Sequence, residues 1–173
     1  MIELKDIKII VLDVDGTLTD GKIYYDNLGN EMKAFNIKDG MAIVQAIKND
    51  ILFAIITGRK SDIVKKRGDE LGINHIYQGV NNKLQVLNKL LLELNLENDN
   101  VMYIGDDIND LEIIRSVKYS ACPADAANEV INVCTFVSKF TGGNGAVREI
   151  VERVLKVQNK WDRIVQNYFG VNQ

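Results

Sequence analysis

Three groups of reactive side chains each follow an apolar segment of the chain. Asp13 and Asp15 come directly after residues 9–12, Thr57 closes a second apolar segment, and Asp106 follows a third. If these segments are parallel strands of one sheet, their carboxyl ends meet at one edge, where α/β proteins bind ligands. The spacing therefore predicts one shared site rather than three separate acidic loops.

The carboxylates of such a site need a cation. Like charges about 4 Å apart repel by roughly 4 kcal/mol at an effective dielectric near 20. A set of oxygen ligands suits Mg²⁺, which keeps several of its waters. A bound Mg²⁺ would also hold a phosphate oxygen and reduce its repulsion from an attacking carboxylate. We therefore expect Mg²⁺ as the cofactor and a phosphate ester as the substrate.

Groups that bind phosphate follow the second apolar segment. Thr57 offers a hydroxyl, Gly58 an exposed backbone N–H at the expected start of a helix, and Arg59 a planar guanidinium. A further cation is expected on the far side of the phosphate, and Lys83, near the start of a leucine-striped helix, is the candidate. On residue type alone, Lys83 would be a solvated surface lysine.

The elements that must position these groups alternate between strands and helices. Apolar patterning predicts strands at 9–12, 52–56, 101–104, 118–122 and 133–137. It predicts helices over 39–49, 60–72 and 82–95, and a long helix from about 145 to 168. Alternation on this scale predicts an α/β fold, a Rossmann-like three-layer sandwich with a mostly parallel central sheet.

Residues 21–36 interrupt this alternation. Two tyrosines and Met32 flank the turn-forming run 26–30, which predicts a β-hairpin with a five-residue turn that contains glycine. The insertion is too short to be a second domain. We therefore expect a single domain over 1–173, with the hairpin in place of a cap domain and a C-terminal helix and tail over 145–173.

Composition argues against several classes of protein. A chain of 173 residues can bury a core without disulfides, and its formal charge of −3 gives no electrostatic reason to expect nucleic acid. Cys122 and Cys134 are the only cysteines and His75 is the only histidine, so two core thiols are expected rather than a zinc site. Neither a signal peptide nor a membrane span is expected, which favours the cytoplasm.

Four short motifs spread over the chain resemble those of a known superfamily. Residues 13–21, DVDGTLTDG, resemble the first signature of the haloacid dehalogenase-like hydrolases. Thr57, Lys83 and residues 105–110, GDDIND, fall where the second, third and fourth signatures of that superfamily stand. The order and the spacing hold over the whole chain.

Further segments narrow the resemblance. They are LTDG at 18–21, NIKDG at 36–40 after the hairpin, TGR at 57–59 and GGNGAVRE at 142–149. Together they make the chain similar to the small, capless branch of 3-deoxy-D-manno-octulosonate 8-phosphate (KDO 8-phosphate) phosphatases. The chain length agrees, because it leaves no room for a large cap.

The resemblance implies roles for the matching residues. Asp13 would be the nucleophile and Asp15 the general acid–base. Asp13, the backbone carbonyl of Asp15, and Asp106 would hold Mg²⁺, with Asp107 and Asp110 supporting the metal site. Thr57 and Lys83 would complete the catalytic set by gripping the phosphate. The implied substrate positions are Asp15, Asn36, Ile37, Lys38, Asp39, Gly40, Thr57, Gly58, Arg59, Arg67 and Lys83.

The implied reaction has two steps. Asp13 would attack phosphorus in line while Asp15 protonates the leaving alkoxide, which gives an aspartyl phosphate. Asp15 would then take a proton from the water that hydrolyses this intermediate. Asp15 must begin protonated, and crowding by two other carboxylates is expected to favour that form.

The resemblance also implies a homotetramer in which neighbouring subunits close each site. Apolar hairpin residues without an expected home inside one chain, Tyr24, Tyr25, Met32 and Phe35, agree with subunit contacts. The expected partners are a small sugar-acid phosphate and further copies of the chain, with neither nucleic acid nor a membrane.

Several alternatives remain open. The substrate could be the 9-phosphate of N-acylneuraminate or its deaminated analogue, although relatives resembling those enzymes tend to carry glutamate at the position of Arg59. Broad phosphatase activity is a further alternative. A receiver-like signalling domain would have its acidic pair on the first strand and its phospho-acceptor on an internal one, whereas Asp13 follows the first strand here. A catalytically idle regulator is disfavoured because no catalytic position is substituted.

Overall fold

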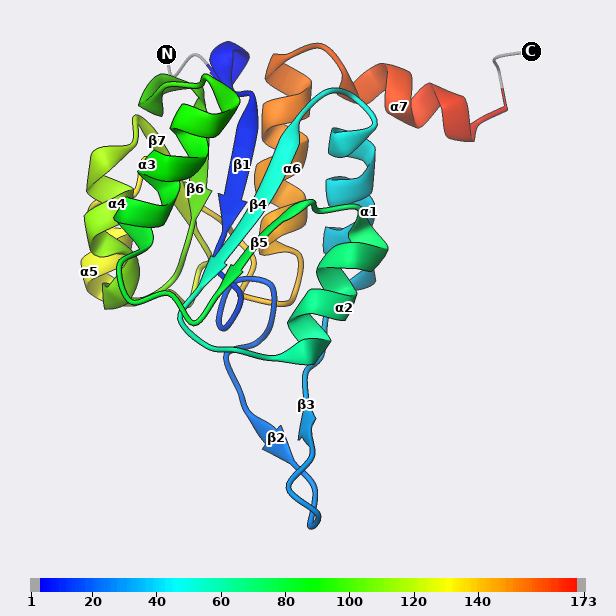
Figure 1. Cartoon of the computed structure of the whole chain (residues 1–173). Coiled ribbons are helices and arrows are strands. Elements are labelled where there is room, and N and C mark those ends of the chain that lie inside the picture. The colour runs from blue at the N-terminus through cyan, green and yellow to red at the C-terminus, as the bar shows by residue number, and fades with distance from the viewer. Residues whose placement is uncertain (1–3, 171–173) are drawn as a thin grey trace.

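Six strands form one parallel sheet in the computed structural model, which describes residues 4–170 (Figure 1). They are β1 (Ile9–Leu12), β4 (Leu52–Thr57), β5 (His75–Gln78), β6 (Val101–Ile104), β7 (Tyr119–Cys122) and β8 (Phe136–Val137). Their order across the sheet is β5, β4, β1, β6, β7, β8, and every neighbouring pair is parallel. The predicted parallel sheet is confirmed, and β5 is an additional strand that apolar patterning did not predict.

β1 lies between β4 and β6 and sets the position of the site. All four of its residues are buried, as expected for a strand covered on both faces. Leu12 pairs in register with Ile55 on one side and with Ile104 on the other. The three strands therefore end nearly level, which brings the residues that follow them to one edge.

Helices cover both faces of the sheet and give the predicted three layers (Figure 1). One face carries α1 (Ile37–Ile47), α2 (Asp62–Leu71) and α6 (Ala146–Val157). The other carries α3 (Lys83–Leu94), α4 (Leu111–Ser116) and α5 (Asn128–Ile131). The first three predicted helices correspond to α1, α2 and α3, with each end within two residues of the predicted one, whereas the short α4 and α5 were not predicted.

The long helix predicted from 145 to 168 is wrong, because the chain bends after α6. Asn159 adopts the left-handed conformation with φ of 56°, and α7 (Trp161–Tyr168) begins just beyond it. The N–H of Lys160 donates to the carbonyl of Leu155 at 2.8 Å, which closes the helix end. Asparagine tolerates this conformation better than most residues do, so Asn159 was the signal for the break.

The predicted hairpin forms and projects from the carboxyl edge of the sheet (Figure 1). Its strands are β2 (Tyr24–Tyr25) and β3 (Glu31–Met32), paired antiparallel. Asp26 closes the five-residue turn by accepting from the N–H groups of Leu28 and Asn30, both at 2.8 Å. The insertion is a small arm over the site edge rather than a cap domain.

The glycine-rich segment 142–145 packs against the loop that follows β1. A Cβ on Gly142 would lie 1.8 Å from the carbonyl oxygen of Gly16, so only glycine fits there. The N–H of Gly143 donates to the carbonyl of Thr17 at 3.1 Å. The segment is therefore a structural turn that supports the Asp13–Thr17 loop from behind.

Asp39 joins the first and last helices of the core. Gly145, the N-cap of α6, has no side chain to accept a helix N–H, and Asp39 Oδ1 accepts the N–H of Arg148 at 2.7 Å instead. Asp39 is 1% exposed. Its carboxylate thus acts as a helix cap supplied from another element.

Two further expectations concern the chain as a whole. In the part of the chain that the structure describes, no helix is both long enough and apolar enough to cross a membrane. Cys122 is buried and Cys134 half-buried, and both are free thiols, as predicted. The predicted single domain includes residues 1–3 and 171–173, which lie outside the described residues.

Candidate active site

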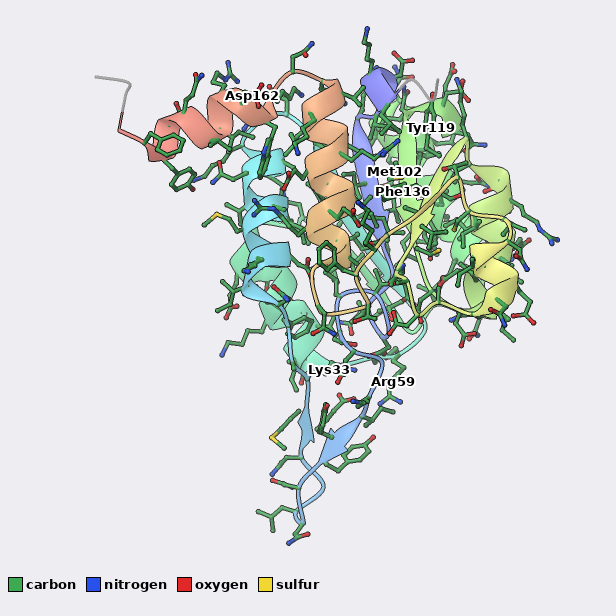
Figure 2. The ribbon with its side chains drawn as sticks, turned by 180° about the vertical axis from the view of Figure 1, so that it is seen from behind. Lys33, Arg59, Met102, Tyr119, Phe136 and Asp162 are labelled. Atoms are coloured by element: carbon green, nitrogen blue, oxygen red, sulfur yellow. The ribbon has the colours of Figure 1, made fainter. Side chains whose placement is uncertain are left out.

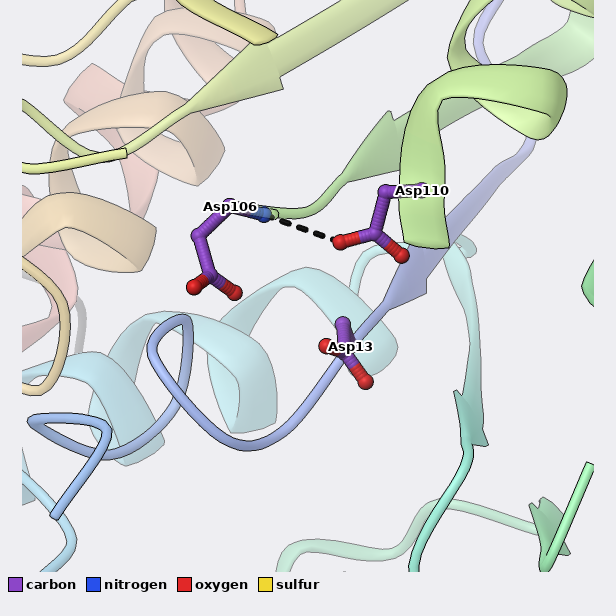
Figure 3. Close-up of side chains that lie close together, drawn as sticks. All are labelled: Asp13, Asp106 and Asp110. Atoms are coloured by element: carbon purple, nitrogen blue, oxygen red, sulfur yellow. Dashed lines mark hydrogen bonds between the residues drawn. The ribbon is translucent and has the colours of Figure 1, made fainter. Parts of the chain in front are cut away.

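Three carboxylates converge at the carboxyl edge of the sheet (Figure 3). Asp13 follows β1, Asp106 follows β6, and Asp110 ends the short helix Ile108–Asp110. Each contributes an oxygen, and these oxygens all lie within 4.8 Å of one another. Gly16 permits this approach, because it has a φ of 92° and a Cβ there would lie 1.9 Å from Asp106 Oδ2.

The electrostatics of this cluster favour a cation. Burial, with Asp13 and Asp110 nearby, raises the pKa of Asp106 to about 7. Burial and the charge of Asp110 likewise raise the pKa of Asp13 to about 6, against the opposing effect of Lys83. Near neutral pH, protons or a metal ion must reduce the negative charge here.

The donor atoms suit a hard divalent cation. Asp13 Oδ1 is buried without a directed hydrogen bond, although Lys83 Nζ lies 3.0 Å from it. That contact is an ion pair between opposite charges, and Lys83 Nζ also lies 2.6 Å from Asp110 Oδ1. A buried carboxylate oxygen with an unused lone pair, beside the carboxylate of Asp106, fits an oxygen-coordinated ion such as Mg²⁺.

Asp110 differs from the other two carboxylates because the protein satisfies both of its oxygens. Lys83 Nζ and the Tyr103 hydroxyl each donate to Oδ1 at 2.6 Å. The N–H groups of Asp106 and Asp107 donate to Oδ2 at 3.0 and 3.3 Å. Asp110 therefore orders the loop and Lys83, which agrees with a supporting role.

The carboxylate of Asp15 belongs to a ring of alternating charges. Lys33 Nζ donates to Asp15 Oδ1, and Arg59 Nε lies 3.7 Å from Oδ2. Glu31 Oε1 closes the ring, 2.9 Å from Arg59 Nη2 and 3.5 Å from Lys33 Nζ. Figure 2 shows Lys33 and Arg59 at the base of the hairpin. The sequence did not predict these two cationic partners of Asp15, and its crowding by other carboxylates stays a prediction.

A cavity of about 260 Å³ opens between these groups. Its lining residues are Asp13, Asp15, Gly21, Thr57, Gly58, Arg59, Asp106, Asp107 and Asn109. Lys83 is 5% exposed and reaches the site through Asp13. Gly58 and Arg59 do not begin a helix as expected, because α2 begins only at Asp62.

The other predicted substrate residues, 36–40 and Arg67, do not line this cavity. Asn36 caps α1 by accepting the N–H of Lys38 at 2.8 Å, and Ile37 and Lys38 are exposed. A Cβ on Gly40 would lie 2.4 Å from Arg67 Nη2, so these two residues pack against each other. They form the junction between the hairpin, α1 and α2, and their substrate roles stay predictions.

Four residues of the site were not singled out from the sequence. Thr17 donates to Asp106 Oδ1 at 3.1 Å and lies inside the DVDGT motif. Glu31 and Lys33 are opposite charges two residues apart, which places them on the same face of an extended segment, a pattern that could have pointed to a shared role. Tyr103 is the polar aromatic in the strand VMYI, just before the acidic motif.

Comparison with known proteins agrees with this fold and this site. The profile of the haloacid dehalogenase-like hydrolase family matches residues 69–150. The 3-deoxy-D-manno-octulosonate 8-phosphate phosphatase KdsC of Escherichia coli (strain B / BL21-DE3) is 44% identical over 162 residues, which cover 94% of this chain and 86% of the relative.

Solved structures of 3-deoxy-D-manno-octulosonate 8-phosphate phosphatases are also similar to this chain. The 3-deoxy-D-manno-octulosonate 8-phosphate phosphatase of Moraxella catarrhalis, in complex with magnesium ion, phosphate ion and KDO, superposes with a TM-score of 0.94 at 40% identity, covering 96% of this chain and 95% of that one. The cobalt-bound enzyme of Haemophilus influenzae has a TM-score of 0.88 at 35% identity, covering 92% of this chain and 93% of that one.

The fold and the acidic site thus define a hydrolase of the haloacid dehalogenase-like class. Within that class, the chain belongs to the family of 3-deoxy-D-manno-octulosonate 8-phosphate phosphatases.

The raised pKa values of Asp13 and Asp106 predict a pH-dependent response to Mg²⁺. The metal-free folded state retains protons that the unfolded chain releases near pH 4, so its free energy of unfolding falls as pH rises from about 4 to about 7. Mg²⁺ would replace these protons and stabilise the fold. The rise in melting temperature with saturating Mg²⁺ should be larger at about pH 8 than at about pH 5, by scanning calorimetry. Equal rises would contradict this account, and Asp106→Asn should reduce the rise at both pH values.

Proposed function

We propose that this protein is a Mg²⁺-dependent phosphomonoesterase that hydrolyses KDO 8-phosphate to KDO and phosphate. The observation that carries the proposal is the convergence of Asp13 and Asp106 beside Lys83 and Thr57 at one sheet edge. The Moraxella catarrhalis relative, whose structure contains magnesium, phosphate and KDO, supports both the metal and the substrate.

Asp13, the backbone carbonyl of Asp15, and Asp106 would hold the Mg²⁺ ion. When bound, Mg²⁺ supplies positive charge to the phosphate oxygens and lowers their repulsion from an attacking carboxylate. Thr57 and Lys83 bind the phosphate from the protein side, since Thr57 lines the cavity and Lys83 Nζ lies 3.0 Å from Asp13 Oδ1. Asp107 and Asp110 support the metal site.

Asp13 acts as the nucleophile. One of its carboxylate oxygens attacks phosphorus in line and the bond to the sugar oxygen breaks. Asp15 must be protonated for this step, so that it can give its proton to the leaving alkoxide. Water then attacks the aspartyl phosphate, Asp15 takes a proton from that water, and inorganic phosphate leaves with Asp13 regenerated. The position of Asp15 between Lys33 and Arg59 holds its carboxylate at the cavity wall, where both transfers would occur.

Arg59 is our candidate for recognition of the sugar acid. Its side chain is 44% exposed, lines the cavity and comes from the loop before α2. A guanidinium can bind a substrate carboxylate in bidentate fashion while Glu31 keeps one of its N–H groups occupied. The N-acylneuraminate or deaminated neuraminate 9-phosphates remain the alternative substrates, and the cytoplasmic location stays a prediction.

We expect an oligomer, with a tetramer as the proposed state. Tyr25, Leu28 and Met32 on the hairpin are 60%, 88% and 54% exposed, an apolar surface that contacts between subunits would cover. The cavity lies at the base of that hairpin, so neighbouring subunits could exclude water from it. Light scattering should report a mass above that of one chain, and a fully active monomer at micromolar concentration would contradict the proposal.

Substitution of Asp13 and substitution of Asp15 should impair catalysis in different ways. Asp13→Asn should abolish turnover and the trapping of phosphate on the protein, because no nucleophile remains. Asp15→Asn should lower kcat by about 10²- to 10⁴-fold, the usual contribution of general acid–base catalysis. With p-nitrophenyl phosphate, whose leaving group needs little protonation, Asp15→Asn should still form the phosphoenzyme slowly. Turnover by Asp13→Asn at a nearly normal rate would show that the nucleophile is misassigned.

The wild-type enzyme should hydrolyse KDO 8-phosphate with a higher kcat/KM than either nine-carbon sugar-acid 9-phosphate. Arg59→Ala should lower that value by about 10- to 100-fold, as expected for one charge-assisted hydrogen bond, and should barely change hydrolysis of p-nitrophenyl phosphate, which has no carboxylate. Arg59→Lys is the matched control, because it keeps the charge and loses the bidentate geometry.

Two results would contradict this assignment of substrate. Equal losses on both substrates would make Arg59 a phosphate ligand. A wild-type preference for a nine-carbon substrate would transfer the proposal to the alternative activity.

A further inference from the structure

Tyr103 places a polar group in the core directly beneath the site. It is the third residue of β6, is 0% exposed, and packs with Leu87 of α3 and Ile113 of α4 among the apolar residues on that face of the sheet. A phenol hydroxyl in such surroundings is stable only if it has a hydrogen-bond partner.

That partner is Asp110. The Tyr103 hydroxyl donates to Asp110 Oδ1 at 2.6 Å, and Lys83 Nζ donates to the same oxygen, also at 2.6 Å. Gly105 provides the space, because a Cβ there would lie 2.4 Å from Asp110 Oδ2 and 2.8 Å from Tyr103 Cε1. The tyrosine and the lysine thus approach one carboxylate oxygen from the core and from the site.

Lys83 is shared between two carboxylates. Its Nζ lies 2.6 Å from Asp110 Oδ1 and 3.0 Å from Asp13 Oδ1. How far the ammonium group extends toward Asp13 depends on the orientation of Asp110 and on how strongly that carboxylate attracts it. A second donor on Oδ1 fixes the orientation and takes part of the attraction.

We propose that Tyr103 is a positioning residue, whose hydroxyl orients Asp110 so that Lys83 is held beside Asp13 and the phosphate. The inference rests on the proposed function, in which Lys83 binds the phosphate. It assigns a role in the reaction to a side chain that touches neither substrate nor metal.

Tyr103→Phe is the direct test, since it removes one oxygen atom and keeps the ring. Among the described residues, Lys83 then becomes the only side-chain donor to Asp110 Oδ1, and its ammonium group is expected to move away from Asp13. We expect kcat/KM for p-nitrophenyl phosphate to fall by about 10- to 100-fold, as for one hydrogen bond to a charged group. Inorganic phosphate, measured by calorimetry in Mg²⁺, should bind more weakly than to the wild type.

A double-mutant cycle separates positioning from general packing. If Tyr103 acts through Lys83, Tyr103→Phe should change phosphate affinity by less than about twofold in the Lys83→Met background. An equal loss of affinity in both backgrounds would overturn the inference, as would wild-type kcat/KM and phosphate affinity in Tyr103→Phe alone. If Tyr103→Phe does not fold, as judged by circular dichroism, Tyr103→Met provides a second variant without the donor.

Two controls keep the outcomes distinct. Tyr119→Phe removes a hydroxyl from another buried tyrosine, on neighbouring β7 and packed in the core on the opposite face of the sheet, and should leave phosphate affinity unchanged. Lys83→Met alone tests the proposed function, because near-wild-type phosphate affinity there would refute the role of Lys83. A large loss in Lys83→Met together with a normal Tyr103→Phe would refute only the role of Tyr103.

Discussion

Mutual repulsion of carboxylates at the carboxyl edge of the sheet is the constraint on which the rest of the site depends. Asp13, Asp106 and Asp110 present oxygens within 4.8 Å of one another, and burial strengthens their interaction. The fold offsets this charge with hydrogen bonds from Thr17, Tyr103, Lys83 and two backbone N–H groups. Asp13 Oδ1 is left without a directed hydrogen bond, with Lys83 Nζ 3.0 Å away, and the carboxylate of Asp13 lines the cavity together with that of Asp106.

The hairpin extends this electrostatic arrangement beyond the sheet. Glu31 and Lys33 belong to the arm, whereas Asp15 and Arg59 follow core strands, and the four charges alternate around a ring. The Lys33 side chain is only 1% exposed in the single chain, so the base of the arm is already fixed by the core. Farther out, the arm exposes Tyr25, Leu28 and Met32. The base of the arm thus shapes the site, whereas these exposed apolar side chains are available to other subunits.

Much of the fold could be predicted because its signals are local. β1, β4 and β6 are continuous apolar runs, and α3 carries a regular leucine stripe, so both types of element follow from periodicity. β5 was not predicted because its sequence HIYQ lacks a strong apolar run, as suits a half-buried strand at the sheet edge. The break between α6 and α7 at Asn159 was not predicted because the helical spacing of apolar residues continues on both sides of it.

Site residues that follow the strands could be placed from sequence, because strand order alone brings them together. The surroundings of Asp15 could not, since its contacts with Lys33 and Arg59 depend on how the hairpin folds back. Asp39 illustrates the same limit. Its motif suggested a substrate contact, which stays a prediction, but not that its carboxylate caps α6, a pairing between distant parts of the chain that no local pattern encodes.

The packing of Gly142 and Gly143 against the loop after β1 has a consequence for the order of folding. The loop that carries Asp13 and Asp15 is completed only by a segment near the other end of the chain, which also brings α6 to its cap on Asp39. Closing contacts of such high sequence separation costs more chain entropy than closing local contacts, so these contacts slow the completion of the fold. A ribosome-bound chain would therefore remain without a finished nucleophile loop until residues 142–145 had emerged, so the fold itself delays activity until the glycine-rich segment is available.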